Sequence, residues 1–567
     1  MHNRLVILLL VFLFCSPELF SQEKQKDDRL RSIVNSSGQA AVTIPFPGAR
    51  EMSVLSHKVS ISSVRDKNVE IILSPLTTEW FISGKYDYSI VEPEDMKGIL
   101  TASSVKQAME WSAYPTYVQY DSIMQSFQTL YPQLCNVDTI GTTKYGKLVL
   151  VLKISDNVLA DESEPEVFFT STIHGDETGG FILMLRLADY LLRNYNTSAR
   201  VKNMVDNLEI WINPLSNPDG TYRTGNTISS PTRYNANGYD LNRNFHDPVD
   251  DDLVRQKETI DMTSFMRDHK FVISSNFHAG EEVVNYPWDR WSRRHPDEDW
   301  FYYISRKYAD TVHVHAVPGY MTFMENGVTD GYDWYYIYGG RQDFITYELQ
   351  GREVTIELDN TKLTPAANLN SLWGYNFRSL LGYLENALYG IHGIVTDFTT
   401  GQPVAAKVFI EGHDADSSHV YSDASSGNFV RLIAPGSWTL TFSAEGYASK
   451  TVNVNVQNNQ MTWIEVQMIP VINPVDTAET KNLFLYPNPA DTRIKMVLPD
   501  RQFGIVDIRL FNSNGVKCLD MVDVHTFEDI PVEIPLSSLT EGFYSIVVSN
   551  TATGISDKAS FIIIHRK

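Results

Sequence analysis

The sequence is poor in cysteine and in positive charge. Only 3 of its 567 residues are Cys, and two of them, Cys135 and Cys518, lie far apart, so a disulfide framework does not stabilise the fold. Lys and Arg number 47 against 69 Asp and Glu, which gives a formal net charge of -22. Binding to nucleic acid or to an anionic membrane needs cationic side chains, so both are disfavoured. The negative charge is compatible with basic substrates, although solubility explains it more simply.

The sequence also lacks an apolar run long enough to span a membrane. The unbroken apolar run from Leu5 to Phe14 is too short for a bilayer but has the length of a signal-peptide core, and a basic residue precedes it. We expect a signal peptide at residues 1–21, export of the protein, and no transmembrane helix in the mature chain. A buried N-terminal helix is the alternative, which the polar sequence from Ser21 onwards disfavours.

The chain exceeds what one hydrophobic core usually fills, and its character changes several times, which predicts several domains. In the central part, strand-like runs such as LVLVLKI and EVFFTSTI alternate with helix-like segments such as GGFILMLRLADYLLRN. This alternation predicts an α/β domain with a mixed, largely parallel sheet flanked by helices. Short strands with Gly and Pro turns predict two β-sandwich modules after it. The expected regions are a small β-rich N-terminal domain, a candidate propeptide, at 22–106, the α/β domain at 107–390, the sandwiches at 391–470 and 483–567, and a linker at 471–482.

A histidine and a carboxylate follow one of the strand-like runs. His174 and Glu177, in HGDE, come after VFFTSTI and before a helical pattern, which places them at the carboxyl end of a strand, where α/β sheets bind ligands. The spacing alone proves little, because about two His-x-x-acid pairs are expected by chance in such a sequence. The rival pairs are His278 with Glu281, His295 with Glu298, and His525 with Glu528. The charged run around His295 is typical of a solvated loop, and His525 lies in the last β-rich module, so His174 and Glu177 are favoured.

Several other histidines are candidates for a third metal ligand. A hydrolytic zinc site needs three protein ligands and an open position for water. His278 ends another strand-like run, FVISSNF, and could face the same edge of the sheet as His174. His246, His313 and His315 are competitors, and the strand-end position favours His278.

Five short motifs together resemble a known enzyme family. They are HGDE at 174–177, NPDG at 217–220, RYNANGYDLNRNF at 233–245, NFHAG at 276–280 and TIEL at 355–358. In this order they resemble the zinc metallocarboxypeptidases, most closely the branch of carboxypeptidases E, N, M and D. The resemblance covers about residues 111–390, and the following HGIVTDFTTGQPVAAKVFIEG is similar to the transthyretin-like domain of that branch. It implies an exopeptidase with one zinc ion per catalytic domain, acting on the C-termini of peptides or proteins.

The resemblance also implies roles at the reaction centre. His174, Glu177 and His278 match the zinc ligands, and Glu357 matches the glutamate that takes a proton from the zinc-activated water. Zinc lowers the pKa of a bound water towards ~7, so a nearby carboxylate can act as general base. Arg233 matches the arginine that polarises the scissile carbonyl and stabilises its oxyanion.

Other residues match the part of the family site that holds the end of the substrate. Asn242 and Arg243 match the pair that clasps the terminal carboxylate, for which a guanidinium is suited by its two parallel donors. Tyr335 matches the mobile tyrosine that closes over the bound terminus, with Tyr336 as the neighbouring alternative. Asp240 is expected to orient the first histidine ligand, and an aspartate in an ordinary turn is the alternative.

Two further matches bear on substrate preference. Asp289, in NYPWD, matches the position that lines the pocket for the departing side chain, and Gln342 matches a second position in that pocket. An ion pair with Lys or Arg there could contribute up to ~4 kcal/mol, so we expect a preference for basic C-terminal residues. Arg290, beside Asp289, could neutralise the pocket and remove that preference.

The last module resembles a secretion signal. The segments LFLYPNPADTRIKMVLPD, VDIRLFNSNGVKCL and LSSLTEGFYSIVVSN resemble the C-terminal sorting domain of the bacterial type IX secretion system. The resemblance implies passage across two membranes through the type IX machinery, with removal of the module on secretion or surface attachment. The expected location is outside the cell or on its surface. A β-sandwich that binds sugar or packs on the enzyme is the alternative.

Two other functions are compatible with the sequence. One is an amide hydrolase on the same scaffold, such as a cell-wall peptidase or a deacylase, but Asn242 and Arg243 favour substrates with a free α-carboxylate. The other is a noncatalytic surface-binding protein, which the complete set of ligands, glutamate and arginine disfavours. The sequence therefore predicts a secreted, monomeric zinc carboxypeptidase.

Overall fold

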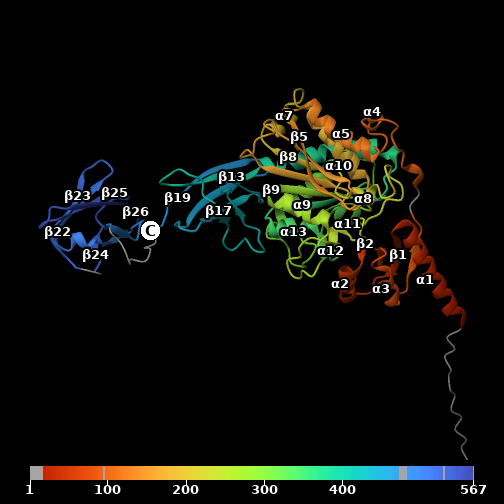
Figure 1. Ribbon diagram of the computed structural model, residues 1–567, viewed down its shortest axis with the longest axis horizontal. Helices are drawn as coiled ribbons and strands as arrows, with labels where there is room; N and C mark the ends of the chain where they lie inside the picture. Colours follow the sequence, from red (N-terminus) through yellow and green to blue (C-terminus); the bar gives the residue numbers. More distant parts are fainter. Residues whose placement is uncertain (1–16, 94–95, 472–481, 528–529, 566–567) are drawn as a thin grey trace, which may run out of the picture.

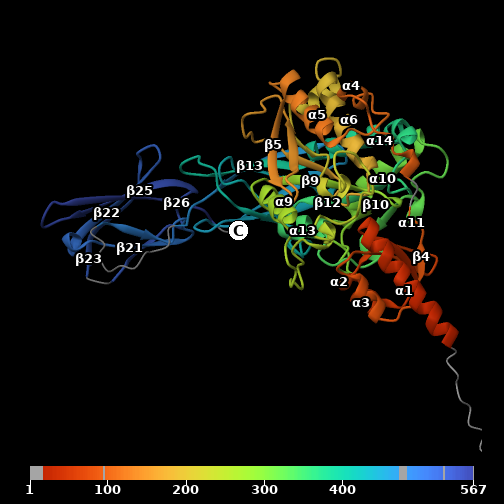
Figure 2. The ribbon, with the colours of Figure 1, turned by 45° about the vertical axis from the view of Figure 1, so that its right-hand side comes forward.

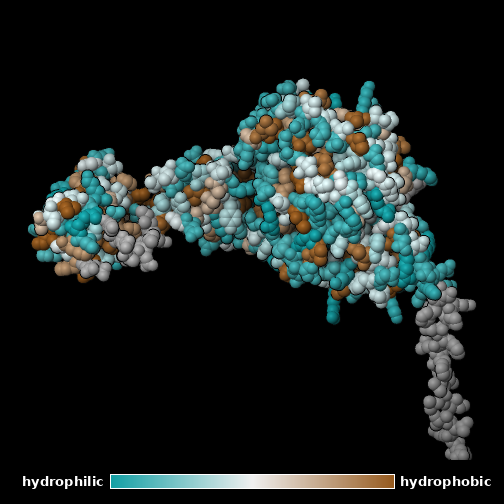
Figure 3. All heavy atoms as spheres, viewed as in Figure 1, coloured by the Kyte–Doolittle hydropathy of each residue, from teal (hydrophilic) through white to brown (hydrophobic). Residues whose placement is uncertain are grey.

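The computed structural model describes residues 17–93, 96–471, 482–527 and 530–565. Figure 1 shows an N-terminal domain, a central α/β domain, a β-sandwich and a last β module. On the visible face, hydrophilic and hydrophobic residues are interspersed (Figure 3). The apolar run from Leu5 to Phe14 lies outside the described residues. Among the helices that are described, none is long and apolar enough to cross a membrane.

A mixed sheet of eight strands forms the centre of the α/β domain. Its strands are β5 (Cys135–Thr142), β6 (Leu148–Ile154), β7 (Glu166–Ser171), β8 (Glu209–Asn213), β9 (Phe271–His278), β10 (Glu282–Tyr286), β11 (Val328–Asp330) and β12 (Arg352–Leu358). The strand order is β11-β10-β12-β9-β7-β8-β6-β5. Strands β12, β9, β7 and β8 run parallel, whereas β10 is antiparallel to β12, and β6 is antiparallel to β8 and β5. The mixed, largely parallel sheet predicted from the sequence is confirmed.

Helices flank this sheet (Figures 1 and 2). They are α4 (Val105–Ala108), α5 (Tyr117–Leu130), α6 (Gly179–Asn194), α7 (Ala199–Val205), α8 (Pro218–Thr221), α9 (Lys257–Arg267), α10 (Glu298–His315), α11 (Phe323–Asn326), α12 (Gly331–Trp334), α13 (Arg341–Glu348) and α14 (Leu369–Glu385). A large apolar core joins α5, α6, α10 and α14 to the sheet. A second core, which includes Phe168, Met262 and Phe344, packs α9 and α13 on it.

The carboxyl ends of the parallel strands bring the sequence motifs together. Strand β7 ends at Ser171, three residues before His174, and β9 ends at His278. In the register of β12 with β9, Glu357 pairs with His278. Neighbouring parallel strands end at the same edge of a sheet, so residues distant in sequence meet there.

The N-terminal domain contains helices as well as the expected strands. Its elements are α1 (Pro17–Ser37), β1 (Ala40–Pro45), α2 (Ala49–Lys58), β2 (Ser60–Arg65), β3 (Asn68–Leu73), α3 (Thr78–Ser83) and β4 (Ser89–Val91). The strands form an antiparallel sheet in the order β2-β3-β1-β4. Leu30, Val42, Leu55 and Phe81 belong to its separate apolar core. Figures 1 and 2 show this domain against the central domain, near α11.

Two β modules follow the central domain. The first contains β13 (Gly390–Asp397), β14 (Lys407–Phe409), β15 (Val420–Tyr421), β16 (Asn428–Arg431), β17 (Gly436–Ser443), β18 (Lys450–Val456) and β19 (Met461–Met468). The second contains β20 (Phe484–Tyr486), β21 (Arg493–Val497), β22 (Gly504–Asn512), β23 (Lys517–Thr526), β24 (Val532–Pro535), β25 (Gly542–Asn550) and β26 (Ser556–Ile563). Each has a three-stranded and a four-stranded sheet around its own apolar core. The two described cysteines, Cys135 and Cys518, are free.

A buried ion-pair network joins the first β module to the central domain. Asp297 Oδ2 accepts hydrogen bonds of 2.7 Å from both Arg352 and Arg431, and His413 lies 2.9 Å from Asp297 Oδ1. Arg431 and His413 belong to the β module, whereas Arg352 begins β12. The prediction of a solvated loop around His295 is wrong, since His295 is only 2% exposed. Asp297 is buried together with its cationic partners, because an unpaired carboxylate would be unfavourable there. His295, two residues before it, is buried with it.

Candidate functional site

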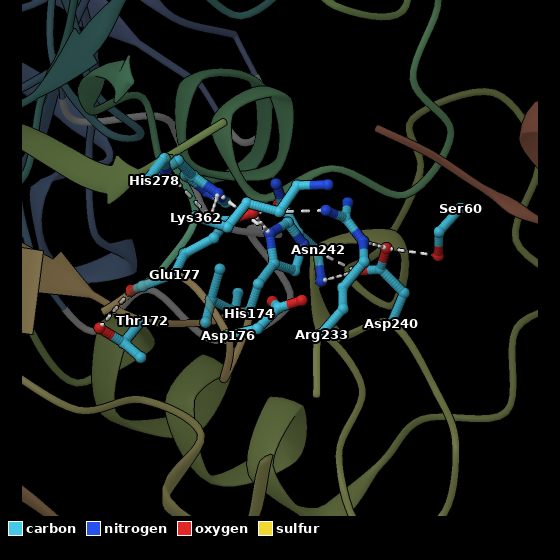
Figure 4. A network of polar contacts seen from close by, with 12 residues as sticks. Ser60, Thr172, His174, Asp176, Glu177, Arg233, Asp240, Asn242, His278 and Lys362 are labelled. Atoms are coloured by element: carbon cyan, nitrogen blue, oxygen red, sulfur yellow. Dashed lines mark hydrogen bonds and ion pairs between the residues drawn. The ribbon is translucent and has the colours of Figure 1, made fainter. Parts of the chain in front are cut away.

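Three side chains from two strand ends converge on one point (Figure 4). His174 Nδ1 lies 2.8 Å from Glu177 Oε1, and His278 Nδ1 lies 2.8 Å from Glu177 Oε2 and 3.1 Å from His174 Nδ1. All three residues are buried, and their ligand atoms lie within 4.8 Å of one another. Two imidazole nitrogens and a carboxylate form the ligand set of a catalytic zinc site. These residues therefore fit a zinc ion.

Close backbone packing positions the loop that carries His174. A Cβ at Gly175 would lie 2.4 Å from the backbone of Gly220, so only glycine fits there. Asn217, at the start of α8, accepts a hydrogen bond from Gly220 N–H at 2.9 Å and donates one to the carbonyl of Ile173 at 3.2 Å. The NPDG motif thus braces the backbone beside the first histidine.

Asp240 fixes the orientation of His174. Its Oδ1 lies 3.1 Å from His174 Nε2, and its Oδ2 accepts a hydrogen bond of 2.8 Å from Arg233 Nε. An acceptor at Nε2 selects the tautomer that leaves Nδ1 for a metal. Although burial favours the neutral acid, Arg233 and His174 hold the pKa of Asp240 well below its ordinary value.

Glu357 lies on β12 beside the end of β9, where its backbone pairs with that of His278. Burial, and then the charges of Glu177 and Glu281, raise the pKa of Glu357 well above its ordinary value, while Arg233 opposes this shift. A divalent cation held by Glu177 would oppose it further. With such a cation bound, the carboxyl group of Glu357 would ionise more easily.

Two buried arginines, Arg233 and Arg243, carry positive charge in this region. Arg233 Nη1 is 3.4 Å from Glu177 Oε1. Arg243 Nη2 donates a hydrogen bond of 3.1 Å to the backbone carbonyl of Ile61, in β2 of the N-terminal domain. Among the described residues, Arg243 Nε has no hydrogen-bond partner. Asn242, beside it, accepts a hydrogen bond of 3.0 Å from the N–H of Arg341. Against the effect of burial, the charges of both arginines lower the pKa of Asp240, which contacts His174, so both act on the same region.

Asp289 is a buried acidic residue three positions after the end of β10. The residue is 3% exposed, and its Oδ1 accepts hydrogen bonds from Asn285 at 3.0 Å and Gln342 at 3.2 Å. Burial raises the pKa of Asp289 to about 7. A Cβ at Gly331 would overlap Asp289 Oδ1, so the backbone at this position packs directly against the carboxylate and only glycine fits.

The neighbouring Arg290 does not pair with Asp289. Its Nε donates a hydrogen bond of 2.9 Å to Asp247, and its Nη2 donates one of 2.7 Å to Asp250. The guanidinium is therefore occupied by two other carboxylates. Arg290 therefore does not form an ion pair with Asp289.

Tyr335 and Tyr336 point to different surroundings. Burial raises the pKa of Tyr335 to about 12, and the charges of Arg243 and Arg233 oppose this shift, as expected for a phenol close to both. The guanidinium of Arg290 instead lies 4.8 Å from the ring centre of Tyr336. The surroundings thus favour Tyr335 as the tyrosine next to the two arginines.

The N-terminal domain supplies contacts to the site that the sequence did not predict. Ser60 Oγ donates a hydrogen bond of 2.7 Å to Asp240 Oδ2 (Figure 4), next to the Ile61 carbonyl that Arg243 contacts. Gln39 Oε1 accepts a hydrogen bond of 2.7 Å from the N–H of Arg233. The contacts join residues that are about 180 positions apart, and no local motif marks them.

The competing histidines lie elsewhere. His246 pairs with Glu348, and His313 Nε2 lies 2.7 Å from the carbonyl of Met321. Asp297, His413 and Asp414 also lie close enough together to hold a metal ion. Asp297 already pairs with two guanidinium groups, however, so this group does not suit a further cation. Of the rival pair His525 and Glu528, the second residue lies outside the described part of the chain.

Three family models match consecutive parts of the chain. They are described as zinc carboxypeptidase for residues 120–379, carboxypeptidase regulatory-like domain for 390–469, and secretion system C-terminal sorting domain for 484–564. The three matches agree with the resemblances found in the motifs.

Curated relatives come from plants and animals. Carboxypeptidase SOL1 of Arabidopsis thaliana is 32% identical over 363 residues, which are 62% of this chain and 71% of that protein. Human carboxypeptidase D is 33% identical over 365 residues, which are 61% of this chain but only 26% of that protein. The human carboxypeptidase N catalytic chain is 29% identical, over 64% of this chain and 88% of that one.

A solved structure agrees on the fold. The carboxypeptidase A from Helicoverpa armigera has a TM-score of 0.50 at 16% identity, over 62% of this chain and 97% of that one. The fold similarity, the sequence match to SOL1 and the convergence of His174, Glu177 and His278 agree with one another. The chain belongs to the zinc carboxypeptidase family.

Proposed function

We propose that the protein is a secreted carboxypeptidase that releases Lys or Arg from the C-termini of peptides or proteins. One observation carries the proposal: in addition to burial, the charges of both arginines, of Glu357 and of Asp289 all act on the pKa of the Tyr335 hydroxyl, so these groups lie around it. Arg243 is a partner for a terminal carboxylate, and Asp289 is a partner for a basic side chain. A chain end with a basic side chain satisfies both groups.

The residues of the chain divide the catalytic work. A zinc ion held by His174, Glu177 and His278 would supply a Lewis acid and activate the attacking water. Glu357 takes a proton from the water as it adds to the scissile carbonyl, and returns it to the nitrogen as the C–N bond breaks. Arg233 stabilises the negative charge that develops on the carbonyl oxygen.

A further set of residues restricts the reaction to chain ends. Arg243 binds the terminal carboxylate through two parallel donors, which an internal peptide bond cannot accept. Asn242 lies beside it, and Tyr335 closes over the bound terminus. An amide substrate without the free carboxylate leaves the buried guanidinium unpaired, which disfavours binding.

The metal assignment predicts one zinc ion per chain in the purified protein. His278→Ala is expected to lower the zinc content below about a tenth of the wild-type value, because two ligands hold a zinc ion far more weakly than three. Metal analysis of both proteins after dialysis measures this. His246→Ala is the control, since that side chain pairs with Glu348 away from the triad. Equal zinc in His278→Ala and the wild type would contradict the assignment.

The acidic pocket predicts a pH-dependent preference for basic ends. Because the pKa of Asp289 is raised to about 7, the carboxylate is neutral below that pH and charged above it. The ratio of kcat/KM for C-terminal Arg over C-terminal Phe is expected to rise as the pH passes through about 7. Asp289→Asn should lower the ratio by about 10-fold and remove its pH dependence. A wild-type enzyme that cleaves Phe as fast as Arg at high pH would contradict the preference.

We also propose that the N-terminal domain acts as an inhibitory propeptide. Its Ile61 carbonyl occupies Arg243, and Ser60 contacts Asp240. Glu70, in β3, pairs with Lys362 at 2.9 Å, and Figure 4 shows Lys362 close to the triad. A substrate carboxylate must displace the Ile61 carbonyl to reach its arginine.

The sorting module supports export through type IX secretion. The family model for this module matches residues 484–564. We propose that the enzyme acts outside the cell or on its surface, after loss of this module.

A further inference from the structure

The partners of Glu281, which is 4% exposed, come from the N-terminal domain. Ser63 Oγ donates a hydrogen bond of 3.0 Å to its Oε1, and Arg65 Nη2 donates one of 2.5 Å to its Oε2. Both residues belong to β2. Within the described residues, these are the only hydrogen bonds or ion pairs found for this carboxylate. If the N-terminal domain moved away, Glu281 would therefore lose both of these partners.

Glu281 comes directly before β10, and the register of that strand relates it to Glu357. Val283 pairs with Glu357, and Asn285, two residues further on, contacts Asp289. Glu281 lies two residues from Val283 in the opposite direction, just before the strand begins, and its charge adds to the effect of burial in raising the pKa of Glu357, as expected for two nearby carboxylates. The proposed catalytic base thus lies between two acidic groups, Asp289 on one side and Glu281 on the other.

The next residue along the chain points elsewhere. Glu282 accepts a hydrogen bond of 2.9 Å from the N–H of Met321, in the central domain. Successive side chains at the start of a strand alternate between its faces. Of these two neighbouring glutamates, only Glu281 therefore contacts the domain that covers the cleft.

This arrangement matches the direction of a bound substrate. A peptide with its last side chain at Asp289 and its scissile bond at Glu357 must extend its preceding residue towards Glu281. We infer that Glu281 is a specificity-determining residue that binds a basic side chain immediately before the scissile bond. In the structure described, which we call the closed form because the N-terminal domain contacts the site, the guanidinium of Arg65 takes the place of that side chain.

The inference rests on the proposed function and adds a second charge requirement to it. The favoured substrates end in two consecutive basic residues, one bound by each acid. A carboxylate that is nearly buried disfavours an acidic or apolar side chain at this position, because neither one replaces the cation that satisfies it. Discrimination on the order of 10-fold is expected from one such charged hydrogen bond.

Three peptides that differ only in the penultimate residue test the inference. Each ends in Arg, preceded by Arg, Ala or Glu, and kcat/KM is measured with the full-length protein, as purified and after limited proteolysis. The wild type should prefer Arg to Ala at this position by about 10-fold, with Glu the poorest. In Glu281→Gln the Arg over Ala ratio should fall to about 2-fold or less, and Glu281→Lys should favour the Glu peptide.

The ratio within each variant separates recognition from a general loss of activity. A change in folding or in the basicity of Glu357 scales all three peptides alike and leaves their ratios unaltered. Glu282→Gln is the matched control and should keep the wild-type ratios, because its contact is to Met321. Zinc content and melting temperature are measured for each variant.

The outcomes distinguish this inference from the proposed function. Release of Arg at equal rates from all three peptides would overturn the role of Glu281 and leave the carboxypeptidase assignment intact. Ratios in Glu281→Gln that match the wild type would overturn it as well. If no peptide loses its terminal Arg in either preparation, the proposed function fails and the inference fails with it.

Discussion

Replacing Glu357 with Gln is expected to lower kcat for release of a C-terminal Arg by about 10²–10⁴-fold, which is the range that general acid–base catalysis contributes. The amide keeps the size of the side chain but neither accepts a proton from water nor returns one to the leaving nitrogen. The zinc content should be unchanged, because the proposed ligands His174, Glu177 and His278 remain. Steady-state kinetics and metal analysis of the same preparation measure both quantities.

Glu282→Gln is a suitable control for this experiment. Glu282 starts β10, where its backbone pairs with Leu358, one residue beyond Glu357. Its side chain contacts the backbone of Met321, so its loss removes a neighbouring acid without removing the base. A Glu357→Gln enzyme that retains more than about a tenth of the wild-type kcat would assign the base to another residue.

Much of the central domain could be predicted because several of its strands contain long apolar runs. Runs such as LVLVLKI and EVFFTSTI became β6 and β7, buried on both faces of the sheet. The convergence of His174 and His278 was also accessible, since parallel strands end at the same edge. Position at a strand end was therefore a better guide than the His-x-x-acid spacing.

Side-chain direction and long-range packing could not be predicted in the same way. The sequence could not tell whether Arg290 pairs with Asp289, because the answer depends on Asp247 and Asp250, about 40 residues away. The burial of His295 depends on ion pairs with a later domain. No periodicity or motif within residues 40–93 indicates that the sheet of the N-terminal domain contacts the site.

The contacts between the N-terminal sheet and the central domain predict the second large effect. Activity should increase when these contacts are weakened. The double variant Arg65→Ala/Glu70→Ala removes the ion pairs to Glu281 and Lys362, which lie at the edge of the cleft. If the open form is about 1% populated in the wild type, opening the cleft should raise kcat/KM by on the order of 100-fold. The enzyme from which limited proteolysis has removed the N-terminal domain should show a similar gain in kcat/KM. Continuous assays with a peptide ending in Arg measure each form.

A matched control separates release of the domain from its destabilisation. Arg31 and Glu79 form an exposed ion pair of 2.7 Å between α1 and α3, inside the N-terminal domain. Arg31→Ala/Glu79→Ala removes the same two charges as the double variant without touching the cleft, so kcat/KM should stay within about 2-fold of the wild type. Equal activity of the wild type and of Arg65→Ala/Glu70→Ala would mean that the domain does not limit entry. Because Arg243 contacts the Ile61 carbonyl in the closed form, the gain should appear mainly in KM, the quantity that reflects access of the substrate to the site.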